Sequence, residues 1–104
     1  MKVIRVYKGV SSKYKKTIKL KGLFPNAFVT TSKDEAIRYA KEDAKYPVGG
    51  FGMIDIKSSP MILIMDIPES WFIKKYESLL GTPGAEEMII GKKVPASMIR
   101  MQIL

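Results

Sequence analysis

Residues 27–46, AFVTTSKDEAIRYAKEDAKY, contain the clearest local structural signals in the chain. The first five residues are mostly β-branched or aromatic and predict a strand. Ser32 and Glu35 then have the spacing of a capping box, in which each side chain accepts a hydrogen bond from the other residue's backbone amide. Small and apolar residues recur on one helical face after this box. We therefore expect a strand at 27–31 and a helix from about 33 to 46, ending before Pro47.

The residues before and after this unit add further strands. Residues 2–10 alternate between apolar and polar side chains and predict a strand. Strands are also expected near 51–57, 61–67, 87–90 and 98–103. The Lys-rich residues 11–26 are interpreted as a hairpin or a mobile arm, with a short strand at 17–20.

A second helix is expected to begin at Pro68 and to end at Gly81. Four apolar residues at helical spacing support it: Phe72, Tyr76, Leu79 and Leu80. Trp71 and Phe72 are expected to belong to the core. At 104 residues the chain has room for one domain, residues 1–104. The predicted fold class is α+β, with six or seven mostly antiparallel or mixed strands and two helices.

The composition excludes several kinds of chemistry. The chain has no His and no Cys, so it cannot form a Ser-His-Asp triad, a Cys nucleophile, a disulfide or a thiolate zinc site. Its aspartates are not clustered at the spacing of metal ligands, and no metal site is expected.

The positive charge is concentrated at the start of the chain. Lys and Arg number 18 against 10 Asp and Glu, and residues 1–21 hold eight of the basic residues and no acid. The remaining residues are therefore neutral overall. A basic segment of this kind indicates a phosphate-bearing or polyanionic partner. The alternative is a solvated edge that lysines keep soluble.

Targeting and membrane signals are not apparent. Charged residues interrupt the apolar ones at the start of the chain, whereas a signal peptide has an uninterrupted apolar stretch there. The longest aliphatic run, Met61 to Met65, is too short to cross a bilayer. We therefore expect a cytoplasmic protein with no membrane partner. The absence of Cys and the scarcity of side-chain amides are typical of thermophilic proteins, whereas the seven Met residues are not.

Three short motifs carry the candidate chemistry. The first is Tyr7-Lys8-Gly9-Val10, at the end of the opening strand. The second is residues 28–32, FVTTS, followed by a helix that contains Tyr39. The third is residues 84–90, GAEEMII, where an acidic pair begins an apolar strand.

In this order the motifs resemble those of the ADP-ribosyltransferase superfamily, whose members transfer ADP-ribose from NAD. That family has Arg or His before a small residue on its first strand, a hydroxyl-rich strand end that leads into a helix, and a Glu that begins a late strand. The resemblance covers nearly the whole chain and implies an ADP-ribosyltransferase-like split sheet. It also implies NAD as the substrate, with a protein or a nucleic acid as the acceptor.

The resemblance assigns a role to each matching residue. Glu87 corresponds to the catalytic Glu, with Glu86 as the alternative if the register differs by one. A carboxylate near the ribose suits this reaction, because breaking the nicotinamide–ribose bond develops positive charge on the sugar. The residues expected to bind NAD are Lys8, Gly9, Thr30, Thr31, Ser32 and Tyr39.

Two positions depart from the family pattern. Lys8 stands where the family has Arg or His, and it lacks the planar fork of Arg. Ala85 stands where the arginine-modifying members have a second acid, so protein arginine is the least expected acceptor.

Other interpretations remain open. A strand that ends in Thr-Thr with Ser as a helix cap is also common as a purely structural feature, and Glu86 and Glu87 also fit two surface acids. The competing functional class is a basic nucleic-acid-binding protein without enzymatic activity. In that class lysines would neutralise phosphates while Tyr7 and Tyr14 stack on bases. These lysines are Lys13, Lys15, Lys16, Lys19 and Lys21. A third class is a structural or toxin-like partner protein without a ligand of its own.

Overall fold

The computed structural model describes residues 2–44, 59–77 and 83–104. Six antiparallel strands form one sheet in the order β4-β5-β2-β1-β3-β6. The strands are β1 (Val3–Ser11), β2 (Ala27–Thr30), β3 (Pro60–Pro68), β4 (Phe72–Glu77), β5 (Glu86–Ile90) and β6 (Ile99–Ile103). With helices α1 (Lys15–Lys21) and α2 (Lys33–Ala44), this arrangement confirms the α+β class.

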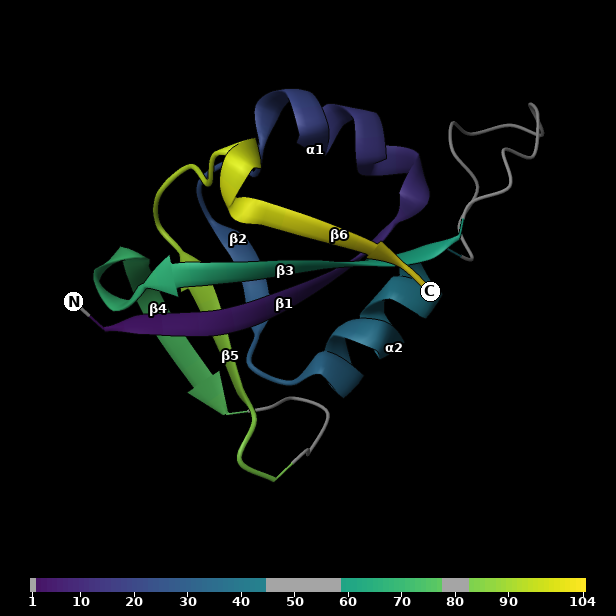
Figure 1. Ribbon diagram of the computed structural model, residues 1–104. Helices are drawn as coiled ribbons and strands as arrows, with labels where there is room; N and C mark the ends of the chain where they lie inside the picture. The colour runs from purple at the N-terminus through teal and green to yellow at the C-terminus, as the bar shows by residue number, and fades with distance from the viewer. Residues whose placement is uncertain (1, 45–58, 78–82) are drawn as a thin grey trace.

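The sheet consists of two halves with a narrow connection. β1 pairs with β3 along its whole length, from Val3↔Pro68 to Ser11↔Pro60, and β2 pairs with β5 along its whole length. Between the halves, β1 and β2 are in register at one position, Tyr7↔Thr30. In Figure 1 strands β1, β3 and β6 run across the view, and β2, β5 and β4 cross that direction at a steep angle. β1 and β2 therefore diverge on either side of this pair.

The predicted strands at 2–10, 27–31, 61–67, 87–90 and 98–103 are confirmed to within one or two residues. The helix expected after Ser32 is also confirmed as α2, up to Ala44 in the described part of the chain. The strand expected near 51–57 lies outside the described residues.

The prediction for residues 11–26 is wrong. A short 3₁₀ turn, Ser12–Tyr14, leads into α1 instead of a hairpin or arm. α1 packs on the core through its one buried residue, Ile18. It ends at Gly22, which has a φ of 68° and whose backbone amide donates a hydrogen bond to the Ile18 carbonyl. Leu23 then pairs with Val94, which ties the segment to the loop before β6.

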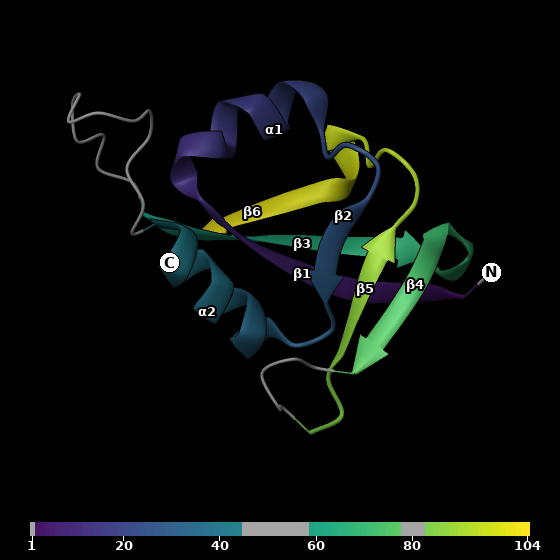
Figure 2. The same ribbon diagram turned by 180° about the vertical axis from the view of Figure 1, so that it is seen from behind.

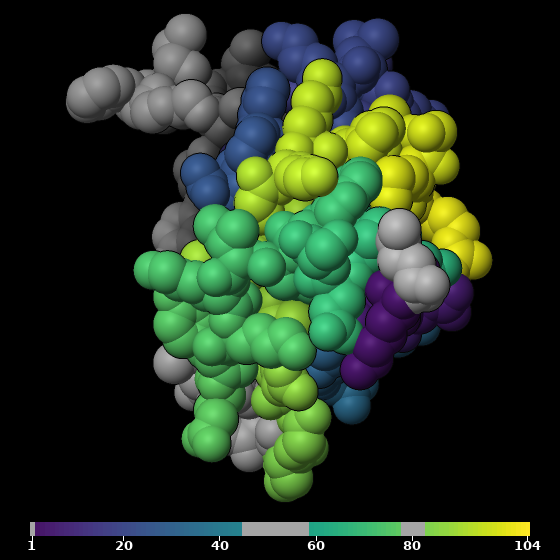
Figure 3. Space-filling view, turned by 90° about the vertical axis from the view of Figure 1, so that its left-hand side faces the viewer, coloured from purple at the N-terminus to yellow at the C-terminus, as the bar shows by residue number. Residues whose placement is uncertain are grey.

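The second predicted helix is also wrong over residues 68–77, whereas its last predicted residues, 78–81, lie outside the described part of the chain. After a 3₁₀ turn, Glu69–Trp71, the chain forms strand β4, which pairs with β5. Phe72 and Tyr76 fit a helical repeat, but in the strand a bulge between Phe72 and Lys74 shifts the register, so that Phe72 pairs with Ile90 and Tyr76 with Glu87. Trp71 and Phe72 do pack against the core as expected. β4 is one of the two edge strands of the sheet, and its residues from Ile73 to Glu77 are exposed to solvent (Figure 3).

Apolar residues are buried on both faces of the sheet. The larger cluster includes Val6, Leu63, Met65, Met88 and Ile90 and also takes in Ile18 of α1. The smaller cluster joins Ala36 and Ala40 of α2 to Ile62 of β3. None of the helices in the described ranges has the length and hydropathy needed to cross a bilayer.

Gly9 sets how closely α2 approaches β1. A Cβ atom built at this position would lie 1.9 Å from the Ala36 carbonyl oxygen and 2.4 Å from the Ala40 amide nitrogen. Both atoms belong to the helix backbone, so a side-chain rotation cannot relieve the contact.

We predict that Gly9→Ala lowers the free energy of unfolding by about 3 kcal/mol, because overpacking here must displace α2. Gly84→Ala is the control: Gly84 has a φ of 75° but no atom within 4 Å of an added Cβ. That variant should lose about 1 kcal/mol from backbone strain alone. Urea denaturation measures both variants, and equal losses would contradict the packing argument.

Candidate functional site

The three sequence motifs meet where the two halves of the sheet join. Thr30 of β2 pairs with Tyr7 of β1 on one side and with Glu87 of β5 on the other. Residues directly opposite each other in antiparallel strands point to the same face. Tyr7, Thr30 and Glu87 therefore form a row on one face, and Tyr7 packs there with the cluster beneath α2. Residues separated by about 80 positions in sequence are thus brought side by side.

The Thr30 hydroxyl organises the start of α2. It donates to Glu35 Oε2 at 3.0 Å and accepts from the Ser32 amide at 3.0 Å. The Ser32 hydroxyl in turn accepts from the Glu35 amide at 3.3 Å, which confirms one of the two bonds of the predicted capping box. The other bond is wrong, because the Ser32 amide donates to Thr30 and the Glu35 carboxylate accepts from Thr30 instead. Glu35 is fully buried, so its carboxylate bonds to Thr30 inside the molecule. Ser32 acts in this structure as the helix cap.

Glu87 and Glu86 occupy different environments. Glu87 is 0% exposed, whereas the neighbouring Glu86 is exposed, as expected for consecutive residues of a strand. Thr31 joins β2 to the start of β5, because its amide donates to the Glu86 carbonyl at 2.9 Å and its hydroxyl accepts from the Glu86 amide at 2.9 Å. The register thus brings Glu87, rather than Glu86, next to Thr30.

Tyr39 of α2 contacts the Glu87 carboxylate. Its hydroxyl donates to Glu87 Oε1 at 2.9 Å. Burial raises the pKa of Tyr39 to about 12, with further contributions from the hydrogen bond and charge of Glu87 and from the charge of Glu35. The phenol therefore stays protonated at neutral pH and remains a donor. The other carboxylate oxygen, Glu87 Oε2, is buried and has no hydrogen-bond partner within the described residues.

A cavity of about 370 Å³ lies where β1 and β2 diverge, within the size range of small-molecule sites. β1, β2 and α2 provide most of its lining, and these elements are seen from the opposite side in Figure 2. Tyr39 and Thr30 line the cavity and also adjoin Glu87, so they connect the buried carboxylate with it. In the described ranges, no group of three or more acidic side chains is arranged to hold a metal ion.

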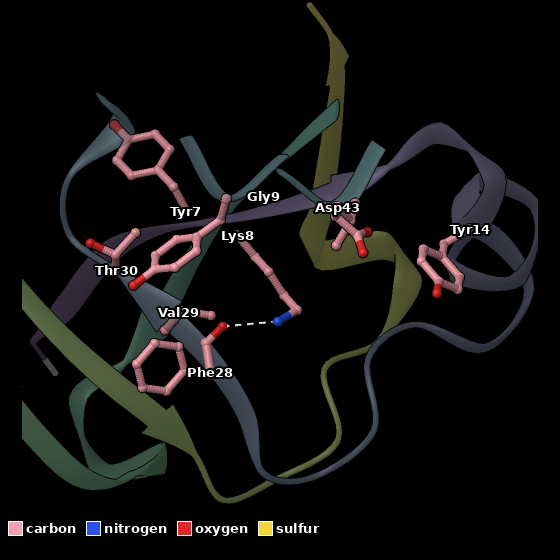
Figure 4. Close-up of a pocket in the computed structure, with 10 residues that line it drawn as sticks. Tyr7, Lys8, Gly9, Tyr14, Phe28, Val29, Thr30 and Asp43 are labelled. Carbon is pink, nitrogen blue, oxygen red and sulfur yellow. Dashed lines mark hydrogen bonds between the residues drawn. The ribbon is translucent and has the colours of Figure 1, made fainter. Parts of the chain in front are cut away.

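Lys8 spans the gap between the diverging strands. Its ammonium donates to the Phe28 carbonyl of β2 at 3.0 Å (Figure 4). Lys8 lies between Thr30 on one side and Asp43 and Tyr14 on the other. Burial lowers the pKa of Lys8, and the nearby Asp43 carboxylate opposes that shift. An ammonium has three donors, and the bond to Phe28 uses one of them.

Gly9 presents backbone polar groups to the same cavity. The Ser11 amide donates to Asp43 Oδ2 of α2 at 2.7 Å, on the edge of β1 that faces away from β3. Backbone groups of alternate residues in a strand point to the same edge. The Gly9 amide and carbonyl therefore face this edge, where the pairing of β1 with β2 is limited to Tyr7. They provide one donor and one acceptor to the cavity that Lys8 also lines.

The structure thus collects five of the seven predicted site residues around the cavity. Lys8, Gly9, Thr30 and Tyr39 line it, and Glu87 adjoins it. Thr31 and Ser32 lie next to it and bond to β5 and to α2. The lysines of the basic segment lie on the 3₁₀ turn and on α1.

Sequence reasoning did not assign Glu35 and Asp43 to the site, and it named Tyr14 only for the nucleic-acid alternative. Glu35, Tyr39 and Asp43 are spaced by four and so share one face of α2. That spacing was a usable signal, but the capping box offered a different role for Glu35. Tyr14 had a signal only as an aromatic residue among lysines, and nothing local connects it with the cavity.

Comparisons with known proteins do not identify the chain, because no family model matches it and a search of curated proteins finds no match. Inference about function therefore depends on the geometry of this site.

We predict that one tyrosine titrates at about pH 12, well above the ordinary value near 10. Ultraviolet absorbance of the phenolate should show this late component, and Tyr39→Phe should remove it. Because the folded pKa is raised, the stabilisation is complete below pH 10 and is lost as the pH rises through about 12. Tyr14→Phe is the matched control and should leave the late component in place. A late component that survives in Tyr39→Phe would show that the assignment is wrong.

Proposed function

We propose that this chain is a small ADP-ribosyltransferase-type domain that binds NAD in the cavity and cleaves the nicotinamide–ribose bond. The observation that carries the proposal is the position of Thr30, which pairs with both Tyr7 and Glu87 beside the cavity. Three motifs that resemble those of one family from sequence alone also meet in space. A sheet whose halves join at one residue pair is compatible with the split sheet of that family.

The groups around the cavity suit the parts of NAD. The Lys8 ammonium can neutralise a phosphate or bond to a ribose hydroxyl. The Gly9 amide and carbonyl supply one donor and one acceptor for amide or hydroxyl groups. Aromatic rings of Tyr7, Phe28 and Tyr39 line the same space and offer stacking surfaces for a nicotinamide.

Glu87 would stabilise the transition state. As the bond to nicotinamide breaks, the ribose gains positive charge, and a carboxylate in a site shielded from water offsets that charge strongly. Glu87 Oε2 is buried without a partner in the described part of the chain, which is costly for a carboxylate oxygen. A ribose hydroxyl would supply the missing donor. Tyr39 holds the other oxygen and so orients the carboxylate.

Thr30 and Ser32 would act as positioning residues. Thr30 contacts the cavity and is held by Glu35 and by the Ser32 amide. Because these bonds fix the end of β2, they also fix the register in which Glu87 faces Thr30.

We predict that Glu87→Gln lowers the rate of nicotinamide release from NAD by 10²–10³-fold, the range typical of a lost charge-stabilising group. NAD affinity, measured by calorimetry, should change little, since the amide keeps the shape of the side chain. Glu86→Gln is the matched control: it removes the same charge one residue away at an exposed position. Its turnover should match that of the parent chain.

Equal turnover in Glu87→Gln would reject the assigned role. Binding itself is tested separately by adding NAD and following the backbone amide resonances of Gly9, Thr30 and Tyr39. The absence of any shift at millimolar NAD would reject the proposed site.

We further predict that NAD affinity falls as the pH is raised above neutral. The lowered pKa of Lys8 means that its ammonium loses its proton at a lower pH than an ordinary lysine. Lys8→Arg remains charged throughout this range, so its affinity should depend less on pH. Calorimetric titrations of both chains over a series of pH values measure the effect, and parallel pH profiles would contradict it.

A further inference from the structure

The 3₁₀ turn and α1 form a basic surface, defined here as residues 12–24. It carries five lysines and no acid: Lys13, Lys15, Lys16, Lys19 and Lys21. All but the first are exposed, and the first is half-buried. The ion pairs among the described residues involve Lys2 and Arg5 and none of these five lysines. Their charge is therefore not neutralised by the described part of the chain itself.

Apolar and aromatic side chains are exposed among these lysines. Leu20 is 83% exposed, Phe24 is 61% exposed and Tyr14 is 43% exposed. Only Ile18 of α1 is buried, so the exposed residues do not serve the core of the described structure. A flat aromatic ring beside ammonium groups is the arrangement that binds single-stranded nucleic acid, with bases on the rings and phosphates on the lysines.

The basic surface continues to the cavity. Tyr14 lines the cavity together with Lys8 and Asp43, and Figure 4 shows it on the far side of Lys8 from Thr30. The Lys13 ammonium lies 5.0 Å from the centre of the Tyr14 ring. α1 begins at the next residue, Lys15. A polyanion bound along α1 would therefore meet positive charge as far as the mouth of the cavity, where Lys8 adds a further cation.

The distribution of side chains on α1 favours nucleic acid over a membrane. An interfacial helix needs a continuous apolar face opposite its charged face. On α1, Leu20 lies one turn from Lys16 and directly between Lys19 and Lys21 in sequence, so it shares its side of the helix with a lysine. The helix has seven residues and one inward apolar residue, Ile18. No separate apolar face is left to enter a bilayer.

We propose that the basic surface binds single-stranded nucleic acid and leads the strand to the mouth of the cavity at Tyr14. Lysines of α1 contact the phosphates, and Phe24 and Tyr14 stack on bases. This binding does not depend on the proposed reaction with NAD, so each can fail without the other.

The test measures the affinity of the full chain for fluorescent oligothymidylate and oligouridylate by anisotropy over a series of salt concentrations. Binding should weaken steeply with salt, with a slope of about −0.7 for each phosphate contact. The double variant Lys16→Gln, Lys19→Gln should reduce the slope by about 1.4 and weaken binding at least tenfold. The control double variant Lys74→Gln, Lys75→Gln removes the same charge from exposed positions on β4 and should change neither quantity.

Stacking is tested by Phe24→Ala, which should weaken binding about tenfold with the salt slope unchanged, since stacking contributes about 1–3 kcal/mol per base. Amide resonances of Tyr14 and Lys8 should shift when the oligonucleotide is added. A salt slope near zero, or equal effects of the two double variants, would overturn the proposal. Binding to vesicles of anionic phospholipid but not to oligonucleotides would overturn it in favour of a membrane surface.

Discussion

The pairing of Thr30 with strands on both of its sides is the constraint on which the rest of the structure depends. It is the position at which β1 and β2 are in register, so it joins the two halves of the sheet. Because the strands diverge from there, the cavity opens directly beside it. The same residue faces Glu87 and holds Glu35. A local change at this residue therefore affects the sheet, the helix and the candidate site together.

Two buried carboxylates lie close to this junction, and burying such groups is costly unless they are hydrogen-bonded. Glu35 receives the Thr30 hydroxyl, and Glu87 receives the Tyr39 hydroxyl. Both bonds run between the sheet and α2, so they also hold the helix against the sheet. Gly9 allows the close approach that these bonds require, since any side chain there would meet the helix backbone. The packing of a glycine and the chemistry of a carboxylate are thus linked through α2.

The sequence pattern predicted correctly those strands and helices whose conformation does not depend on a partner distant in the sequence. β1 alternates, β3 contains a continuous aliphatic run and α2 has helical spacing, and all three were found at the expected places. β4 was predicted as a helix because Phe72 and Tyr76 have helical spacing, whereas the chain forms a strand there by pairing with β5, with a bulge between Phe72 and Lys74 that local spacing does not reveal. α1 was missed because lysines dominate it and its stability depends on burying Ile18 and on Gly22. Lys8, Thr30 and Glu87 were anticipated through the motifs, whereas Tyr14 reaches the cavity only through the tertiary fold.

The structure also separates the basic charge of the first 21 residues into three parts. Lys2 and Arg5 pair with Glu69 and Asp66 at the surface, which accounts for them without any ligand. Lys8 is half-buried in the cavity, where desolvation lowers its pKa and the charge of Asp43 opposes that shift. Of the five lysines of the basic surface, four are exposed and Lys13 is half-buried, and there is no acid among them. Net charge alone could not distinguish a dinucleotide from a nucleic acid as partner. Because Tyr14 belongs to both the cavity and the basic surface, the two proposed partners would meet at this residue.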